Sequence, residues 1–318
     1  DPISTIENAK GIFTGGGNTF LLVSQLYKTK VIDVLEKVVK NKFGFYSAKD
    51  MPTANELSEY YEKRYFQESA GLYRSEYNQD ELVYFDNKAK VAEYICQKSI
   101  GSLLDVGCGE GYFAKYFKEK NWDTKTLDYS SHGISNHNPE LLETHITGDV
   151  FKLLEDITNK EIKYDLINLS NVLEHVIDPI SLLKSLKKLM HKNSYLRISV
   201  PNDFSNFQNF LLEKDYTKNT WVCLPDHLHY FTFETLKFFL HSLDFNCDIL
   251  LGEFPIEIFI ANEKSNYVKD REAGVYAHKS RVEVDNFLFS QGIEKYINYY
   301  EANAKIGFGR QIIAYVKL

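Results

Sequence analysis

The feature that most constrains this sequence is a short apolar strand pattern that ends in an acidic residue and turns through three alternate glycines. The run is Leu103-Leu104-Asp105-Val106-Gly107-Cys108-Gly109-Glu110-Gly111. Glycine suits a backbone that bends sharply beside a ligand, and the N–H groups of a following helix start attract anions. Dinucleotide folds space their glycines as G-x-G-x-x-G, but Tyr112 stands at the place of that third glycine. The run therefore predicts a nucleotide-like loop with its own G-x-G-x-G spacing.

Short apolar segments alternate with helical patterns from Ser102 onward. This rhythm predicts right-handed crossovers and a doubly wound α/β fold, whose mostly parallel sheet is covered on both faces. Strands are expected at 102–106, 124–128, 144–147, 164–169 and 195–200, with helices near 112–120, 151–158 and 179–191. Later strands are expected at 247–251, 256–260 and 311–316, after a helix at 233–243.

Different patterns flank this core, which is predicted to span residues 91–261. The residues before it, 1–90, are predicted to form a helical N-terminal extension. Its helices are expected at 20–39, 54–68 and 87–98, from apolar residues spaced by three and four. After the core, 262–305 is predicted to be an insertion with a helix at 282–302, and 306–318 to hold the closing strand of the core sheet.

Charge and cysteine content exclude several classes of protein. The net charge of −7 argues against the broad basic surface that nucleic acid requires, so no nucleic-acid partner is expected. The four cysteines contain no CxxC pair, which favours a reduced, cytoplasmic protein. No apolar run approaches the roughly 20 residues that cross a bilayer, so no membrane span is expected.

The glycine spacing and the preceding Asp105 resemble the class I S-adenosylmethionine-dependent methyltransferases, in particular a small-molecule branch that includes quinone and sugar methyltransferases. The resemblance implies a Rossmann-like fold with a mostly parallel seven-stranded sheet, and S-adenosylmethionine as cofactor. It also implies that Gly107, Cys108, Gly109 and Gly111 lie under the methionine part of the cofactor, and that Asp105 acts near its ammonium group.

Two further acidic residues end the next two predicted strands. Asp128 follows the second strand, where a carboxylate can accept both hydroxyls of a ribose. The resemblance places Tyr129 against the adenine. It also implies that Asp149 receives the adenine amino group and that the backbone N–H of Val150 contacts the ring.

Two motifs follow the fourth and fifth predicted strands. The segment Ser170-Asn171-Val172-Leu173-Glu174-His175-Val176 resembles the Leu-Glu-His-Val segment of the same branch, which places Ser170 and Asn171 at the cofactor. The segment Pro225-Asp226-His227-Leu228-His229-Tyr230-Phe231-Thr232 resembles its His-x-x-Phe-Thr segment. The histidines at 227 and 229 could chelate a metal, but no third ligand stands at a familiar spacing, so no metal is expected.

Methyl transfer to an alcohol requires a group that removes the hydroxyl proton, and histidine suits this task near neutral pH. The predicted base is His229 or His227, with His175 as a third candidate. The predicted reaction is O-methylation of a sugar hydroxyl, in a nucleotide sugar or a polysaccharide. Alternatives are a quinone-like or phenolic acceptor, a nitrogen acceptor, a nicotinamide-dependent oxidoreductase, or a partner protein that binds the cofactor without catalysis.

Overall fold

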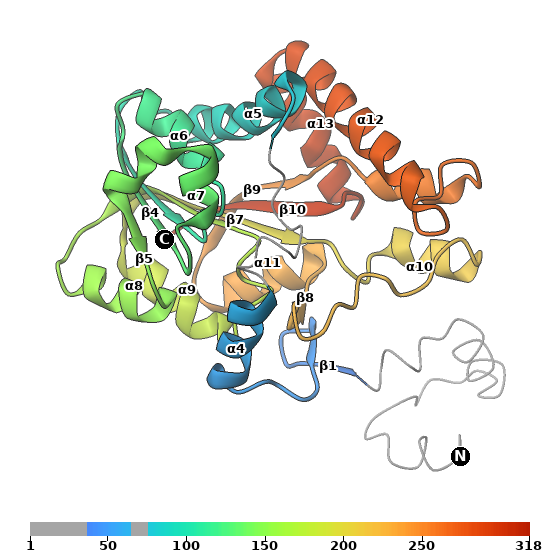
Figure 1. The fold of residues 1–318 in the computed structure, drawn as a ribbon, viewed down its shortest axis with the longest axis horizontal. Helices are drawn as coiled ribbons and strands as arrows, with labels where there is room; N and C mark the ends of the chain where they lie inside the picture. The colour runs from blue at the N-terminus through green and yellow to red at the C-terminus, as the bar shows by residue number, and fades with distance from the viewer. Residues whose placement is uncertain (1–36, 65–75) are drawn as a thin grey trace.

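The computed structural model describes residues 37–64 and 76–318 and has a seven-stranded sheet at its centre (Figure 1). The strand order is β5-β4-β3-β6-β7-β10-β9. Neighbours from β5 to β7 pair in parallel, and β10 runs antiparallel between β7 and β9. The strands are β3 (Ser102–Val106), β4 (Asp123–Asp128), β5 (His145–Thr147), β6 (Tyr164–Ser170), β7 (Met190–Pro201), β9 (Asn246–Gly252) and β10 (Gln311–Lys317). This arrangement confirms the predicted doubly wound α/β fold.

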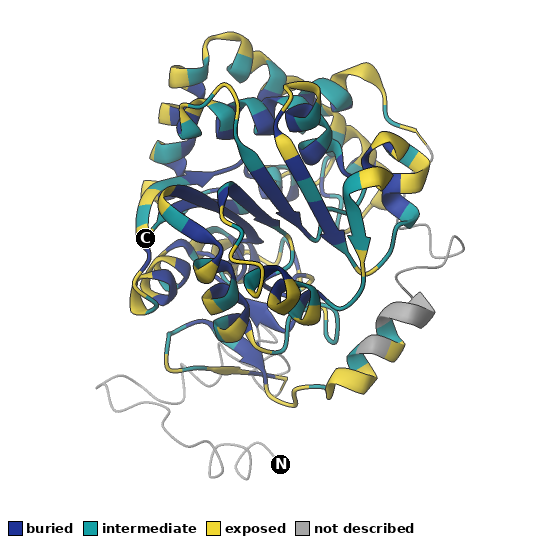
Figure 2. Ribbon diagram, turned by 90° about the vertical axis from the view of Figure 1, so that its left-hand side faces the viewer, coloured by how far each residue is buried: buried dark blue, intermediate teal, exposed yellow. Residues whose placement is uncertain are grey.

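Helices cover both faces of the sheet, as Figure 1 shows. One face carries α5 (Gln79–Cys96), α6 (Tyr112–Glu119), α7 (His132–His137), α12 (Arg271–Ser290) and α13 (Ile293–Lys305). The other carries α8 (Val150–Thr158), α9 (Pro179–Lys188) and α11 (Phe233–Ser242). Successive strand residues face opposite ways, so Leu103 packs in the first layer and its neighbour Leu104 in the second. The central strands β3, β6 and β10 are consequently mostly buried, whereas the edge strands β5 and β9 are more exposed (Figure 2).

A smaller sheet joins three segments that are far apart in the chain. It consists of β1 (Val38–Lys40), β2 (Tyr46–Ala48) and β8 (His229–Tyr230), in the order β1-β2-β8. All its pairings are antiparallel, with Ser47 opposite His229. The segment that carries the predicted histidine base is thus held by residues near the start of the described chain. The remaining elements are α4 (Ala54–Arg64), η2 (Pro139–Thr144), α10 (Asn206–Glu213) and η3 (Ile256–Ala261).

Three expectations about individual elements are wrong. The run at 256–260 forms the 3₁₀ helix η3 (Ile256–Ala261), which begins directly after Pro255, rather than a further strand beside β9. The helix expected at 282–302 is two helices, α12 and α13, which separate at Gly292, where φ is 114°. Residues 38–39, expected at a helix end, form part of β1.

Other expectations meet the limits of the described chain or shift their boundaries. The rest of the helix expected at 20–39 lies almost wholly outside the described residues, as does the end of the one expected at 54–68. The helix expected from residue 87 begins at Gln79, because Asn78 and Glu81 form a capping box that starts it earlier. None of the described helices combines the length and apolar content of a bilayer span.

The topology brings the predicted site residues to one edge of the sheet. In a parallel sheet the carboxyl ends of the strands share an edge, and ligands bind where neighbouring strands lead to opposite sides. Here that point lies between β3 and β6, which pair with each other while β4 and β7 extend the sheet in opposite directions. The loop from Gly107 to Gly111, which we call the glycine loop, follows β3 at this point, and Ser170 ends β6 beside it.

Candidate active site

The glycine loop has the bent backbone that its sequence predicts. Gly107, Gly109 and Gly111 have φ values of 69°, 55° and 82°, in the left-handed region that residues with side chains rarely adopt. The N–H groups of Gly107 and Cys108 donate to the carbonyl of Leu127 at 2.8 and 3.2 Å. These bonds fasten the loop after β3 to the end of β4.

Gly107 and Gly109 lie in different surroundings. A Cβ atom at Gly107 would come within 2.2 Å of Val172 Cγ2, whereas one at Gly109 would meet no atom of the described residues within 4 Å. Val172 belongs to the segment after β6, so this segment packs directly on the start of the loop. The space at Gly109 leaves room for a ligand to approach the backbone.

Asp128 joins the loops that follow β3 and β4. One of its carboxylate oxygens accepts the Gly109 N–H at 2.9 Å, and the other accepts the Ser130 N–H at 3.2 Å. Burial raises the pKa of Asp128, and the backbone hydrogen bonds oppose this rise. The predicted ribose-binding carboxylate therefore lies directly beside the middle of the glycine loop.

Asp105 lies behind the loop in a buried polar chain. Its side chain is 1% exposed, and one oxygen accepts the side-chain amide of Asn168 at 2.6 Å. Asn168 in turn accepts a hydrogen bond from Arg197 at 2.8 Å. The other oxygen of Asp105 has no hydrogen-bond partner among the described residues. Burial raises the pKa of Asp105 to about 7, although Asn168 and Arg197 lower it in part.

The residues predicted for the adenine lie together after β4 and β5. The Tyr129 hydroxyl donates to Asp149 at 3.0 Å, and Tyr129 is one of the exposed large aromatic residues. Asp149 also caps α8 by accepting the Lys152 N–H at 3.0 Å. Val150 turns its side chain into the core, and its backbone N–H lies in the first turn of α8.

The other predicted cofactor residues lie at the end of β6 and on the loops that follow β3 and β6. The Cys108 Sγ lies 3.8 Å from His145 Nδ1, and burial raises the pKa of this thiol well above its usual value. Asn171 follows Ser170 at the end of β6, with φ at 53°, and donates its N–H to the carbonyl of Ser199 at 2.8 Å. This turn directs the following residues back toward the glycine loop.

His229 is enclosed between the two sheets. It is 4% exposed, with Nδ1 2.9 Å from the Ser47 hydroxyl and Nε2 2.9 Å from the carbonyl oxygen of Val176. Burial lowers its pKa to about 4. Both ring nitrogens are engaged in hydrogen bonds that connect β8 to β2 and to the segment after β6.

His175 and His227 lie together with Glu174, and we call these three residues the His-Glu cluster. The two imidazole rings meet edge to face, with centroids 4.8 Å apart, and His175 Nε2 lies 3.7 Å from a Glu174 carboxylate oxygen. Burial raises the pKa of Glu174 to about 8 and lowers that of His175 to about 3. The pKa of His227 is also lowered by burial. The structure thus brings two of the three predicted histidines together and sets His229 apart.

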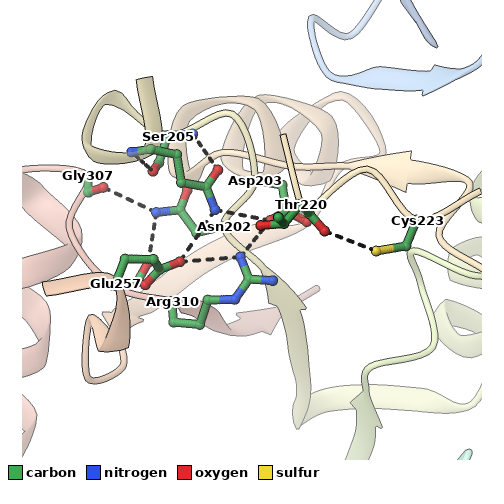
Figure 3. Close-up of polar contacts among 10 residues, drawn as sticks. Asn202, Asp203, Ser205, Thr220, Cys223, Glu257, Gly307 and Arg310 are labelled. Atoms are coloured by element: carbon green, nitrogen blue, oxygen red, sulfur yellow. Dashed lines mark hydrogen bonds and ion pairs between the residues drawn. The ribbon is translucent and has the colours of Figure 1, made fainter. Parts of the chain in front are cut away.

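Figure 3 shows a second polar group, in which two carboxylates surround one arginine. Arg310, just before β10, lies 2.6 Å from an oxygen of Asp203 and 3.5 Å from one of Glu257. Gln208 donates to both carboxylates, at 3.3 and 3.4 Å. Asp203 acts electrostatically on Glu174 and His227. The rim of the site beyond β7 therefore carries more negative than positive charge.

Sequence reasoning missed Asn168, Arg197 and Glu174 as site residues. Asn168 and Arg197 each stand between two buried apolar residues of their strands, and a polar residue there is a signal for a buried hydrogen-bond network. Glu174 was visible in the Leu-Glu-His-Val segment, but only the fold places it, almost fully buried, between the two histidines.

Comparison with protein families gives one match across most of the sheet. The family described as "Methyltransferase domain" matches residues 74–249, more than half of the chain. A second family, peptidase family S51, matches residues 1–45, which are mostly outside the described residues and too few to show membership.

The chain is also similar to curated proteins and to solved structures. A ubiquinone biosynthesis O-methyltransferase of Actinobacillus pleuropneumoniae is 28% identical over 120 residues, covering 35% of this chain and 51% of that protein. The enzyme of the same name from Glaesserella parasuis is 31% identical over 121 residues, covering 34% and 50%. The chain spans about half the length of these curated relatives.

Two of the solved structures show the level of structural similarity. An S-adenosylmethionine-dependent methyltransferase from Archaeoglobus fulgidus has a TM-score of 0.47 at 22% identity, covering 76% of this chain and 95% of that chain. A 1,6-didemethyltoxoflavin-N1-methyltransferase from Burkholderia thailandensis has a TM-score of 0.48 at 11% identity, covering 88% and 98%. Scores at this level add no argument about the site.

Proposed function

The chain belongs to the methyltransferase domain family, and from this premise we propose that it transfers a methyl group from S-adenosylmethionine to the oxygen of a phenolic, quinone-like small molecule. Membership confirms the class predicted from the sequence, with S-adenosylmethionine as its cofactor. The main observation that supports the proposal is that carboxylates lie near the strand ends. Asp105 precedes the open glycine loop, and Asp128 accepts a hydrogen bond from its middle residue, Gly109.

The residues at this edge fit the cofactor that the family uses. The Asp105 oxygen that has no hydrogen-bond partner among the described residues would accept the ammonium group, and the open backbone at Gly109 would admit the methionine part. Asp128 would hold the ribose hydroxyls, with Tyr129 and Asp149 at the adenine end. Cys108, Ser170, Asn171 and Val150 would line the remaining wall.

When bound, S-adenosylmethionine supplies a methyl carbon that positively charged sulfur activates toward a nucleophile. The protein must hold the acceptor oxygen in line with that carbon and remove its proton. The segment from Val172 to His175 connects the two tasks, because Val172 packs on Gly107 and the His-Glu cluster follows within a few residues. We place the acceptor oxygen at this cluster.

Among the three predicted bases, His227 has the arrangement that fits proton removal best. Its Nδ1 is buried and has no hydrogen-bond partner in the described part of the chain. In His229 both ring nitrogens are engaged, and in His175 the Nδ1 atom is 2.8 Å from the carbonyl of Asp226. Within this proposal His227 takes the proton, while His229 has a structural role.

Two candidate acceptors follow from the sequence, and the phenolic one has the better support. The relatives named above are ubiquinone biosynthesis O-methyltransferases, which favours a phenolic hydroxyl. A sugar acceptor was the main prediction, and aromatic side chains such as those between 203 and 224 can stack on sugar faces. In the structure Phe204 packs on Tyr46, Tyr230 and Trp221, whereas Phe210 remains exposed.

The cofactor part of the proposal is tested by calorimetric titration with S-adenosylhomocysteine. We expect one binding site per chain, with at least tenfold weaker binding in Asp128→Asn. Asp123 is the matched control, because it is exposed at the amino end of the same strand, and Asp123→Asn should bind as the wild type does. Saturable binding of NAD with none of S-adenosylhomocysteine would overturn the proposal in favour of an oxidoreductase.

The acceptor part is tested with radiolabelled S-adenosylmethionine and two panels of acceptors. One panel contains catechols and other phenols, and the other contains nucleotide sugars. Labelled methyl ethers of phenols support the proposal, and products from nucleotide sugars alone restore the sugar prediction. Cofactor binding without transfer to either panel would favour a non-catalytic protein.

A further inference from the structure

We propose that the His-Glu cluster, Glu174, His175 and His227, binds a divalent transition-metal cation of the zinc class at the acceptor end of the site. Its role in catalysis rests on the proposed function, but the binding itself does not. The sequence predicted no metal, because His227 and His229 could chelate one but no third ligand stood at a familiar spacing. The fold replaces His229 with His175 and adds Glu174.

The three side chains of the cluster lie close to one another. Each contributes one ligand atom, and these atoms lie within 4.8 Å of one another. The carbonyl oxygen of Asp226 can only accept a hydrogen bond, so His175 Nδ1, 2.8 Å away, carries the proton. His175 Nε2 therefore presents a lone pair to the Glu174 carboxylate, 3.7 Å away.

This tautomer is the one that metal-binding histidines adopt. A ligating histidine commonly donates its second ring N–H to a backbone carbonyl or carboxylate, which fixes the ring and the nitrogen that faces the metal. The Asp226 carbonyl provides that contact to His175 without any bound ion.

The environment of Glu174 is an independent indication that this cluster binds a ligand. Its side chain is 1% exposed, and neither carboxylate oxygen has a hydrogen-bond partner in the described chain. His227 Nδ1 is likewise buried without such a partner. A carboxylate hidden from water is costly unless it is paired or coordinates a metal. A cation between Glu174 and the two imidazoles would satisfy all three side chains.

The surrounding charge also favours a cation. Asp203 and Asp226 act on Glu174 with the same sign of charge, and Arg310, which acts with the opposite sign, is already shared by Asp203 and Glu257. Figure 3 shows this arginine beside both carboxylates. The cluster therefore lies in a negative environment that an anionic ligand would not favour.

Two imidazoles and one carboxylate form the donor set of open zinc sites, in which a fourth position is left for water or substrate. Ligand atoms around tetrahedral zinc lie roughly 3.4 Å apart, for bonds of about 2.1 Å. Small side-chain rotations would bring the cluster to this spacing. The fourth position would then receive the acceptor oxygen.

A cation there would change how the acceptor loses its proton. Coordination lowers the pKa of a bound hydroxyl, so that its proton passes to water and the oxygen is left as an anion. The anion forms the bond to the methyl carbon, and the electron pair of the broken carbon–sulfur bond stays on sulfur. His175 and His227 would then act as ligands, and the cation would take the place of a histidine base.

The test is a titration of the chelator-treated full chain with Zn²⁺ or Co²⁺ alone. We expect one ion per chain, and visible absorption bands of tetrahedral or five-coordinate Co²⁺. Glu174→Gln and His227→Gln should each weaken binding by at least tenfold. His241→Gln is the matched control, since His241 is exposed on α11, and it should bind as the wild type does. Circular dichroism in chelator verifies that each variant is folded.

The outcomes separate this proposal from the proposed function. Absence of saturable binding by the wild type, or equal binding by all variants, overturns the cation site, even when S-adenosylhomocysteine binds and phenols are methylated. Methylation that persists unchanged after chelator treatment removes the catalytic role and leaves His227 as the base. One-to-one binding that depends on Glu174 and His227 supports the site, whatever the acceptor panels show.

Discussion

Asn168 donates its side-chain amide to Asp105 across 2.6 Å, between the two central strands β3 and β6. This contact holds one carboxylate oxygen, while the other has no such partner in the described chain. Arg197 fixes Asn168 from the next strand, so the position of Asp105 is set by three neighbouring strands. A carboxyl group in this position can change its protonation when a cation arrives.

We predict that cofactor affinity depends on pH through Asp105. Burial raises its pKa to about 7 in the chain without cofactor, so the carboxyl is largely protonated below that pH. The ammonium group of the cofactor favours the ionised form, and binding then releases a proton. Affinity for S-adenosylhomocysteine should therefore fall by about tenfold for each pH unit below 7. Calorimetry in buffers with different ionisation enthalpies measures both quantities.

Asp105→Asn is the control for this dependence. Its affinity should be lower and nearly constant over the same pH range, because the titrating group is gone. A wild-type affinity that does not change between pH 5 and 7, within about a factor of two, would contradict the assignment of Asp105 to the ammonium group.

Substitutions at Gly107 and Gly109 should affect the stability of the fold and the binding of the cofactor to different extents. Gly107→Ala places a Cβ against Val172 and should lower the free energy of unfolding by about 3 kcal/mol. Gly109→Ala has open space around the new Cβ, so only the positive φ penalises it, by about 1 kcal/mol. The same Cβ blocks the cofactor, and affinity for S-adenosylhomocysteine should fall at least tenfold. Urea unfolding and calorimetry test the pair, and equal stability losses would refute the distinction.

His229 should matter more for stability than for turnover. His229→Ala removes the hydrogen bonds to Ser47 and to the Val176 carbonyl, and we expect a loss of about 2–3 kcal/mol in unfolding free energy. Ser47→Ala removes one of these bonds and should lose about 1 kcal/mol. The folded variants should retain most of their turnover. A His229→Ala chain of normal stability with turnover reduced a hundredfold would restore His229 as the base.

The stability of helices α12 and α13 should depend on one buried carboxyl group. Asp285 is 1% exposed and accepts hydrogen bonds from the hydroxyls of Tyr296 and Tyr300. Asp285→Ala leaves both hydroxyls without this partner and should lower the unfolding free energy by about 2–4 kcal/mol. Glu283→Gln, at an exposed position of the same helix, should have little effect. Thermal unfolding of both variants tests the difference.

Much of the sheet could be predicted from the sequence because its strands are apolar runs buried on both faces. The position of the three acidic residues was predictable for a different reason. A parallel sheet gathers the carboxyl ends of its strands at one edge, so residues that follow the strands lie near one another. The run at 256–260 misled the prediction because a short apolar run resembles a strand, whereas the chain turns into a 3₁₀ helix directly after Pro255.

The other half of the site depends on contacts that no local pattern reveals. His229 and Ser47 are 182 residues apart in the chain, and Asn168 and Asp105 are 63 apart. The motif gave no reason to distinguish His227 from His229. In the structure His227 belongs to the His-Glu cluster, whereas His229 is hydrogen-bonded to Ser47 and to the carbonyl of Val176. Such differences arise from packing between distant segments, which periodicity does not encode.

The placement of β10 has a consequence for the order in which the molecule is assembled. This strand lies between β7 and β9, although it follows both of them in the chain. As the ribosome extends the polypeptide, β9 has no partner in the sheet until α12, α13 and finally β10 have been made. Until then the edge of β7 is open to other polypeptides, so the nascent chain passes through a period in which it needs protection from aggregation.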